Sequence, residues 1–285
     1  MIERLPSWIK AKRFGGKEYA SIMARTSTLE LHTVCDSAMC PNRGECYNNK
    51  TATLMILGNR CTRNCSFCAV EEGNPLPPNP NEPTNVAKFV AELKLKHVVI
   101  TSVTRDDLPD GGAAHFAATI NAIKSTNPHG TVEVLIPDFK GDIEALKVVV
   151  AAKPSIINHN IETVARLYSV VRPQAIYERS LQLISNVRAL NSSITTKTGL
   201  MAGLGETEYE VVKTMKDLYQ AGCQMLTIGQ YLRPTTNHLP VKEYIRPDVF
   251  EKYRQIGLGI GFKNVFSAPM VRSSYHADET FVETK

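Results

Sequence analysis

The chain has 285 residues, of which 43% are hydrophobic, enough for one large globular domain or two small ones. No run of eighteen or more apolar residues occurs, so we expect no transmembrane helix, and the N-terminus lacks the pattern of a secretory signal. Thirty-three basic and 28 acidic residues leave a formal charge of +5, which permits an acidic protein partner. We therefore expect a cytoplasmic protein that binds neither membrane nor nucleic acid.

Cysteine is the unusual residue, because six of the seven cysteines lie between positions 35 and 68, in two groups of three. An odd number of cysteines in a chain without an export signal argues against a disulfide framework. The seventh, Cys223, precedes an apolar run, and we interpret it as a small core residue.

Residues 1–30 have a weak pattern that predicts an irregular arm or short helices. Next comes the N-terminal triplet, which we define as Cys35, Cys40 and Cys46, with the spacing CX4CX5C. The intervening proline, asparagine and glycine favour tight turns. Three thiolates can converge on a metal here, and a fourth ligand must come from elsewhere. Taken alone, this triplet fits zinc and an iron–sulfur cluster equally well.

A short apolar run at 51–57 predicts a buried strand that leads into the cysteine loop, residues 61–68. Its cysteines, Cys61, Cys65 and Cys68, have the spacing CX3CX2C, so three thiolates can hold a [4Fe–4S] cluster and leave one iron for a substrate. A structural zinc loop and unconnected buried cysteines are the alternatives. The spacing resembles the signature of the radical S-adenosylmethionine (SAM) enzymes. This resemblance implies that the open iron binds SAM and that the reduced cluster cleaves it to a 5′-deoxyadenosyl radical.

The chain then alternates between apolar runs and amphipathic segments, which is typical of parallel sheets with crossover helices. Thr84 and Asp142 are expected to cap helices, and Thr207 with Glu210 forms a capping box. The six expected strands cover residues 51–57, 97–101, 131–136, 156–160, 195–201 and 225–228. The predicted fold is therefore α/β, a partial (β/α)6 barrel of the TIM type; the N-terminal and C-terminal extensions with an auxiliary iron–sulfur cluster are what the family resemblance given below implies.

In such barrels the chemistry takes place in the loops that follow the strands. The cysteine loop and the polar segments 104–112, 158–162 and 203–206 all follow predicted strands. SAM contacts are expected from one glycine pair and from three polar residues of the second segment, and the glycine pair serves equally well as a turn. These residues are Gly111, Gly112, Asn158, Asn160 and Glu162. Arg172, Lys197 and Arg233 are interpreted as structural or solvated charges.

Both cysteine groups together resemble those of the lipoyl synthases, and the resemblance extends over nearly the whole chain. The motifs that carry it are the segments 35–46, 51–58, 61–68, 101–112, 158–163, 199–206, 231–234, 238–241 and 272–277. The last begins Arg-Ser-Ser-Tyr. The resemblance divides the chain into an N-terminal extension with the auxiliary motif (1–50), a barrel core (51–235) and a C-terminal extension with the Arg-Ser-Ser-Tyr motif (236–285).

The resemblance implies a radical-SAM sulfurtransferase with two [4Fe–4S] clusters that inserts two sulfur atoms at C6 and C8 of an octanoyl chain. That chain is linked to a lysine of a lipoyl carrier domain or of the glycine cleavage H protein. Cys61, Cys65 and Cys68 would hold the SAM-binding cluster. The N-terminal triplet and Ser274, with Ser273 as the fallback, would hold the sulfur-donating auxiliary cluster. Further partners are an electron donor such as ferredoxin or flavodoxin, and an iron–sulfur carrier.

Three other functions fit parts of the sequence. One is another radical-SAM sulfur-inserting enzyme of the biotin synthase or methylthiotransferase type. A second is a two-cluster electron carrier, which needs no barrel and ligates its clusters fully with cysteine. The third is a zinc-stabilised binding module for nucleic acid, against which the weak net charge and the absence of an aromatic–basic stripe argue.

Overall fold

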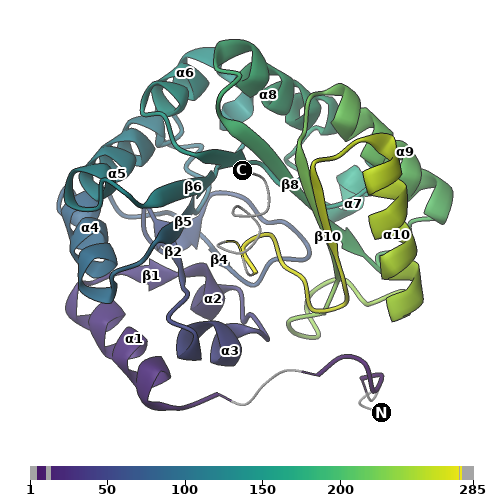
Figure 1. The fold of residues 1–285 in the computed structure, drawn as a ribbon, viewed down its shortest axis with the longest axis horizontal. Helices are drawn as coiled ribbons and strands as arrows, with labels where there is room; N and C mark the ends of the chain where they lie inside the picture. The colour runs from purple at the N-terminus through teal and green to yellow at the C-terminus, as the bar shows by residue number, and fades with distance from the viewer. Residues whose placement is uncertain (1–4, 11–13, 276, 278–285) are drawn as a thin grey trace.

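The computed structural model describes residues 5–10, 14–275 and 277, and they form a sheet surrounded by helices (Figure 1). The strands are β1 (His32–Thr33), β2 (Thr53–Ile56), β3 (Arg60–Cys61), β4 (Glu71–Glu72), β5 (His97–Ser102), β6 (Thr131–Leu135), β7 (Ile156–Asn158), β8 (Thr195–Ala202), β9 (Met225–Gln230) and β10 (Asn264–Ser267). The α-helices are α1 (Lys17–Thr28), α2 (Val34–Ser37), α3 (Arg43–Asn48), α4 (Glu82–Leu93), α5 (Ala113–Thr126), α6 (Ile143–Ala151), α7 (Tyr168–Val171), α8 (Tyr177–Leu190), α9 (Glu208–Gln220) and α10 (Pro247–Ile260). Two short 3₁₀ turns are η1 (Phe139–Gly141) and η2 (Ala165–Leu167).

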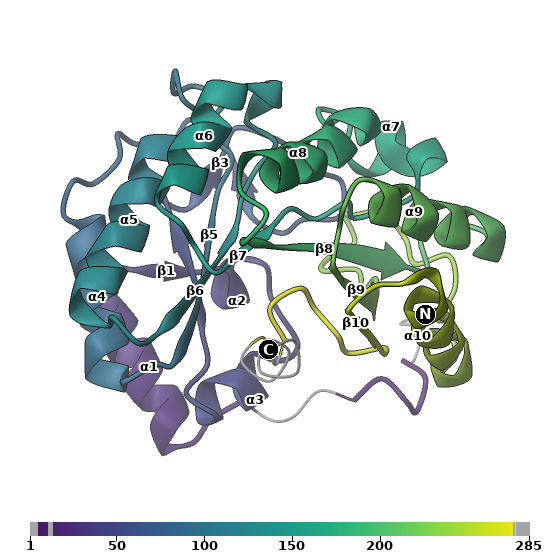
Figure 2. The same ribbon diagram turned by 45° about the horizontal axis from the view of Figure 1, so that its top comes forward.

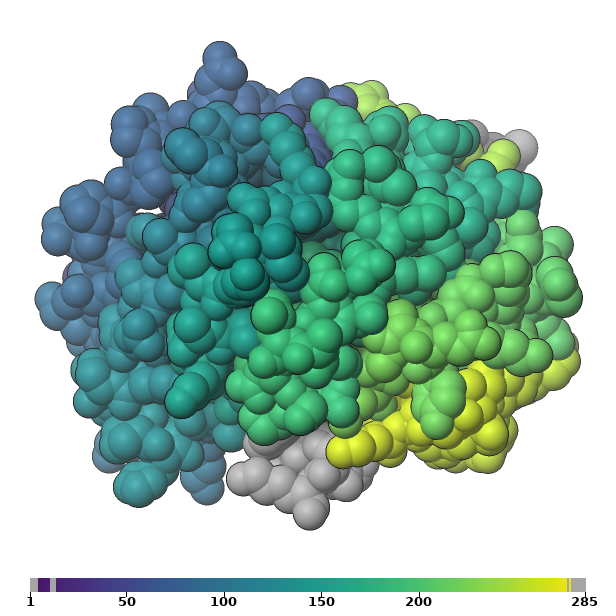
Figure 3. Space-filling model, turned by 90° about the horizontal axis from the view of Figure 1, so that it is seen from above, coloured from purple at the N-terminus to yellow at the C-terminus, as the bar shows by residue number. Residues whose placement is uncertain are grey.

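The main sheet has eight strands in the order β1-β2-β5-β6-β7-β8-β9-β10. All neighbours from β2 to β10 pair in parallel, and β1 adds antiparallel to β2 at one edge. Among the described residues β1 and β10 do not pair, so the curved sheet is an open barrel. Figure 2 shows the helices outside the sheet, and Figure 3 shows teal and green helical segments packed closely over one face.

The predicted partial barrel is confirmed, and all six expected strands are present. The structure adds a seventh parallel strand, β10, which pairs with β9 and is preceded by the crossover helix α10. The sequence signal for β10 is weak because this strand has only four residues, of which Val265 alone is fully buried.

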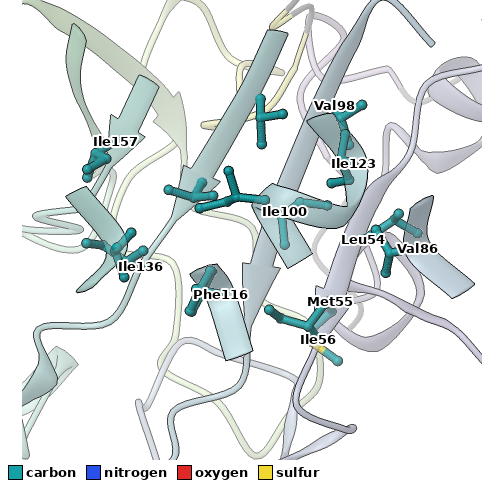
Figure 4. Close-up of a cluster of buried hydrophobic side chains, with 14 of the residues drawn as sticks. Leu54, Met55, Ile56, Val86, Val98, Ile100, Phe116, Ile123, Ile136 and Ile157 are labelled. Atoms are coloured by element: carbon teal, nitrogen blue, oxygen red, sulfur yellow. The ribbon is translucent and has the colours of Figure 1, made fainter. Parts of the chain in front are cut away.

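Apolar side chains from both sides of the strands and from the inner helix faces form the core. Figure 4 shows part of it, where Leu54, Val98 and Ile100 of the strands meet Val86 of α4 and Phe116 of α5. Parallel strands covered by helices are buried on both faces, which explains their continuous apolar runs. No helix among the described residues is long and apolar enough to cross a membrane.

Two of the three predicted helix caps are confirmed. The Asp142 side chain accepts from the backbone N–H of Glu144 and Ala145, and Thr207 forms the expected capping box. Thr84 is not a cap, because α4 begins two residues earlier at Glu82. Pro83 sits in the first turn of α4, where its missing N–H costs no hydrogen bond.

Of the two structures predicted for residues 1–30, an irregular arm or short helices, the described part of this region contains a helix, α1. Helix α1 is amphipathic and packs on α3, the helix that carries Cys46. Ahead of α1, Phe14 lies against Tyr19 and under the guanidinium of Arg43. This region therefore supports the segment that holds the N-terminal triplet.

A buried ion pair crosses the interior of the barrel between β6 and β8. Lys197 Nζ donates to both carboxylate oxygens of Glu133, at 2.9 and 3.1 Å, and both side chains are fully buried. His97 lies on the other side of Glu133. Burial favours the neutral acid, but Lys197 and His97 outweigh it and hold the pKa of Glu133 below its usual value. Lys197 is thus a structural charge, as predicted, and is not solvated.

Replacing Lys197 with Met should therefore destabilise the fold by about 3–5 kcal/mol, because it leaves a buried carboxylate without its main partner. The double variant Glu133→Gln/Lys197→Met should regain most of that loss. Urea unfolding of the protein without its cofactors measures both. Equal stability of Lys197→Met and the unmodified protein would contradict this interpretation of the pair.

Candidate functional site

The four polar loops predicted to carry the chemistry all lie at the same edge of the sheet. The cysteine loop follows β2, and the segments 104–112, 158–162 and 203–206 follow β5, β7 and β8. These strands are parallel, so their carboxyl ends share one edge. The cysteine loop lies at this edge, whereas β1 runs antiparallel to β2 and leads the N-terminal triplet to the amino end of β2.

The N-terminal triplet borders a pocket with about 280 Å³ of empty space that is open in part to solvent. Cys35 comes from α2 and Cys46 from α3, and Cys40 lies in the turn between these helices. Other side chains around the pocket come from the start of β2 and from the C-terminal end of the chain. The full lining is Cys35, Cys40, Asn42, Cys46, Thr51, Ala52, Thr53, Arg272, Ser274 and Tyr275.

Two thiols of this pocket, Cys35 and Cys46, resist ionisation unless a cation is present. Burial, reinforced by the nearby Cys40, raises the pKa of Cys35 to about 11. Burial and the other two cysteines raise the pKa of Cys46 to about 12. Three thiolates in one pocket repel each other, and a bound metal removes that penalty by supplying positive charge. The donor set of three thiols and one hydroxyl fits an iron–sulfur cluster.

The C-terminal strap, defined as residues 268–275, brings Ser274 to this pocket from the far end of the chain. It leaves β10 and runs beside α2 and α3, at the amino end of β2 (Figures 1 and 2). The Asn42 amide donates to the Met270 carbonyl at 2.7 Å, and the Thr53 hydroxyl donates to Ser274 Oγ at 2.9 Å. The Tyr275 hydroxyl donates to Glu45 at 3.2 Å. The strap is thus tied to the elements that carry the triplet.

The two adjacent serines of the strap have different surroundings. Ser274 lines the pocket of the N-terminal triplet. The Asn160 amide, at the carboxyl end of β7, donates instead to Ser273 Oγ at 3.4 Å. Arg272 lies near both regions, since Cys40 and Glu162 each raise the pKa of its guanidinium. Burial has the larger effect and lowers that pKa overall.

The strap can cross β9 only because residue 229 is glycine. A Cβ atom at Gly229 would lie 2.0 Å from the Val271 carbonyl oxygen and 3.2 Å from Arg272 Nη1. With alanine at position 229, these contacts would force the backbone of the strap away from β9. A glycine within a strand is the sequence signal for this kind of close approach.

The cysteine loop is fixed by hydrogen bonds from neighbouring loops. Cys61 Sγ accepts from the backbone N–H of Arg63 at 3.4 Å and of Thr104 at 3.3 Å. His238 Nε2 lies 3.0 Å from the Cys68 carbonyl, which can only accept, so this nitrogen is the donor. Burial raises the pKa of Cys65, and of Cys68 to about 12. His238 is thus a hydrogen-bonded residue.

Asn160 and Glu162 lie together beside Cys65. The Asn160 amide donates to Glu162 at 3.0 Å, and Arg172 Nη1 donates to the Asn160 carbonyl at 2.9 Å. After burial, Arg172 and Glu162 have the largest effects on the pKa of Cys65, which the first lowers and the second raises. Arg172 is only 9% exposed, so it is a buried charge under the cysteine loop, and not a solvated one.

The other predicted SAM contacts have structural partners. Asn158 lies deeper in the barrel, where its amide donates to Glu133 at 3.3 Å. Gly112 precedes α5 with φ of 90°, a conformation that favours glycine. A Cβ on it would lie 2.4 Å from Leu57 Cδ1, and one on Gly111 would lie 2.9 Å from Phe139 Cδ1. The glycine pair is therefore required by its turn, and its contact with SAM stays a prediction.

Among the described residues, no three histidine, cysteine, aspartate or glutamate side chains are grouped closely enough to hold a single metal ion.

Comparison with known proteins identifies the family. The model of the Radical SAM superfamily matches residues 55–218. A lipoyl synthase of Caldanaerobacter subterraneus subsp. tengcongensis is 56% identical over 98% of this chain and 97% of its own length. A lipoyl synthase of Alkaliphilus metalliredigens is 54% identical over 98% of this chain and 96% of its own length. The chain belongs to the lipoyl synthase family of the radical SAM superfamily.

Membership in this family confirms the enzyme class, the [4Fe–4S] clusters and the SAM that the cysteine spacings predicted. Solved structures agree on the fold. Methylornithine synthase has a TM-score of 0.55 at 13% identity, over 79% of this chain and 75% of its own. The FeFe-hydrogenase maturase HydG from Carboxydothermus hydrogenoformans has a TM-score of 0.59 at 17% identity, over 81% of this chain and 56% of its own.

Replacing Gly229 with Ala should displace the strap and move Ser274 away from the N-terminal triplet. We expect faster loss of iron from that site to a chelator, while iron at the cysteine loop is lost at the normal rate. Gly259→Ala is the matched control, because a Cβ at Gly259 meets no atom within 4 Å. Identical iron loss in the two variants would show that the close approach at Gly229 does not position Ser274.

Proposed function

We propose that the chain inserts two sulfur atoms at C6 and C8 of a protein-bound octanoyl chain, with a separate role for each cysteine group. Cys61, Cys65 and Cys68 hold the cluster that binds SAM. Cys35, Cys40, Cys46 and Ser274 hold the auxiliary cluster that supplies the sulfur. The observation that supports this division most strongly is that Ser274, from the last part of the chain, lines the pocket of the N-terminal triplet.

The reaction explains why such cofactors are needed. An unactivated aliphatic C–H bond has no acidic proton, so a side-chain base cannot activate it. When bound, the clusters and SAM supply the radical chemistry and the sulfur atoms, and the protein binds, orients and excludes water. Side chains of the chain itself therefore act by holding one group at each end of β2.

Two buried polar atoms beside Cys65 are suited to SAM. Within the described part of the chain, Asn160 Oδ1 and Arg172 Nε are buried and have no hydrogen-bond partner. The first is an acceptor that suits the amino group of SAM, and the second is a charged donor that suits its carboxylate. Leaving such groups unpaired is costly, which favours a polar ligand here. Asn158, Gly111 and Gly112 stay predicted contacts.

Ser274 is a weaker ligand for iron than a thiolate, because a hydroxyl oxygen is harder than sulfur. At the auxiliary site this difference has a use, since the iron that Ser274 holds can be released more easily than one held by Cys35, Cys40 or Cys46. The part of the strap that carries Ser274 is held by side-chain hydrogen bonds with Asn42, Thr53 and Glu45. It can therefore withdraw while residues 268 and 269 keep their backbone hydrogen bonds with β9.

The substrate we propose is an octanoylated lipoyl carrier domain or the glycine cleavage H protein. The formal charge of +5 is compatible with an acidic carrier. An electron donor such as ferredoxin or flavodoxin, and an iron–sulfur carrier that rebuilds the auxiliary cluster, complete the partners. We place the reaction in the cytoplasm on the basis of the sequence.

The test is anaerobic incubation with SAM, a reductant and an octanoyl-lysine peptide, followed by mass spectrometry. The unmodified protein should add two sulfur atoms to the peptide. Cys65→Ala should abolish SAM cleavage, because its cluster lacks one ligand. Cys40→Ala should form 5′-deoxyadenosine without adding sulfur. Equal loss of SAM cleavage in both variants, with the cluster of the cysteine loop still present, would contradict the proposed division.

The adjacent serines offer a matched pair of variants. Ser274→Ala should slow or stop sulfur insertion while SAM cleavage persists, because only the auxiliary site loses a ligand. Ser273→Ala should have a much smaller effect, since that hydroxyl contacts Asn160 and does not line the pocket. Peptide mass spectrometry and 5′-deoxyadenosine measurement separate the two steps. Normal product formation by Ser274→Ala, together with its loss in Ser273→Ala, would assign the ligand to the other serine.

A further inference from the structure

Arg63 lies within the cysteine loop, between Cys61 and Cys65, yet its side chain is only 4% exposed. Its guanidinium forms two hydrogen bonds with Asp106, from Nε at 2.7 Å and from Nη2 at 3.0 Å. Nη2 also donates to Asp138 at 2.6 Å. A single side chain of the loop thus joins carboxylates from the two segments that follow β5 and β6.

Asp138 is a fixed anchor for this contact. Its side chain is completely buried and also accepts from Arg179 Nη1 at 3.2 Å and from the Lys140 N–H at 3.1 Å. Burial opposes ionisation, but Arg63 holds the pKa of Asp138 at about 2. The carboxylate is therefore charged at neutral pH and cannot leave the guanidinium without a large loss of electrostatic energy.

The segment that carries Asp106 also provides a hydrogen bond to a thiol. Thr62 joins the two segments, because its N–H and its hydroxyl both donate to the Thr104 carbonyl, at 3.1 and 3.0 Å. The Asp106 N–H donates to the Thr62 hydroxyl at 3.0 Å. Residues 104–106 are held against residues 61–63 in this way, with the Thr104 N–H directed at Cys61 Sγ.

We propose that Arg63 is a positioning residue for Cys61: by clamping Asp106 against the buried Asp138, it holds residues 104–106 so that the Thr104 N–H stays bonded to the Cys61 sulfur. This inference rests on the proposed role of Cys61 as a cluster ligand. Hydrogen bonds to ligating sulfurs and their surroundings set the reduction potential of iron–sulfur clusters. Arg63 would thus influence the cluster without touching it.

A direct role in binding the SAM carboxylate is a poorer explanation of Arg63. Two carboxylates already surround its single positive charge, so an additional anion would be repelled. Its planar fork matches the bidentate contact with Asp106, a geometry that a lysine cannot reproduce. The charge and the geometry of residue 63 can therefore be separated by substitution.

The first experiment is amide hydrogen exchange on the full chain without clusters, which does not depend on the enzyme's activity. In Arg63→Lys and Arg63→Gln, peptides that cover residues 60–68 and 103–107 should exchange several-fold faster than in the unmodified protein. The matched control is Arg254→Gln, which removes an exposed bidentate contact with Glu251 on α10. Asp106→Asn should reproduce the faster exchange, and it is the variant to measure if Arg63→Gln does not fold.

The second experiment measures the midpoint potential of the reconstituted protein by electron paramagnetic resonance, using the signal that changes when SAM is added. Arg63→Lys keeps the charge but loses the fork, so its potential should shift to more negative values, as in Arg63→Gln. If Arg63→Lys matches the unmodified protein in both exchange and potential, the positioning role is wrong. Failure of sulfur insertion in the unmodified protein would instead contradict the proposed function and leave the exchange result unaffected.

Discussion

The contact between the backbone of β9 and the C-terminal strap is the constraint on which the paired sites depend. In the proposed auxiliary cluster all four irons have protein ligands, so the N-terminal triplet needs a fourth ligand from elsewhere in the chain. Ser274 supplies a hydroxyl to its pocket only because β10 extends the sheet and the strap then crosses Gly229 without a Cβ in its path. Joining segments so far apart in sequence carries a cost in chain entropy, which the pairing of β10 with β9 helps to offset.

At both cysteine groups, thiols with raised pKa values are neutral before the cofactor binds, so the protein itself must hold each site in shape. Burial raises the pKa of Cys35, Cys46 and Cys68 to 11 or 12, so these thiols are neutral at physiological pH until a cation binds. Cluster binding must therefore release protons, and the affinity for iron falls as the pH falls. Hydrogen bonds to backbone groups and, at the cysteine loop, the ion pairs of Arg63 hold the loops in place beforehand.

Local patterns explain most of what the sequence could predict. Cysteine spacing reflects the geometry of one short loop, and the capping box of Thr207 is contained within four residues. Strand β10 was not predicted, because a run of four residues with one fully buried side chain carries little periodic signal. Thr84 was predicted as a helix cap because it directly precedes an apolar stripe. Helix α4 begins earlier, at Glu82, because Pro83 is tolerated in the first turn of a helix.

The missed features of the site all require knowledge of distant neighbours. Gly229 is an ordinary strand glycine until the strap is placed over it. In the sequence alone, Arg63 looks like an exposed charge of the loop. The carboxylates that it binds, those of Asp106 and Asp138, lie 43 and 75 residues further along the chain. Parallel pairing of β2, β5 and β6 brings these positions to one edge. Residue type and spacing therefore predicted six cysteines as metal ligands, which stay predictions, and the order of the strands was needed to find Arg63 and Gly229.

The most direct test of the central claim is a crystal structure of the anaerobically reconstituted protein, with anomalous diffraction recorded at the iron absorption edge. Two separate iron sites should be found, one at each end of β2. One should be held by Cys61, Cys65 and Cys68, and the other by Cys35, Cys40, Cys46 and the oxygen of Ser274. Iron at only one of these sites, or a second cluster with Ser274 directed away from it, would contradict the account.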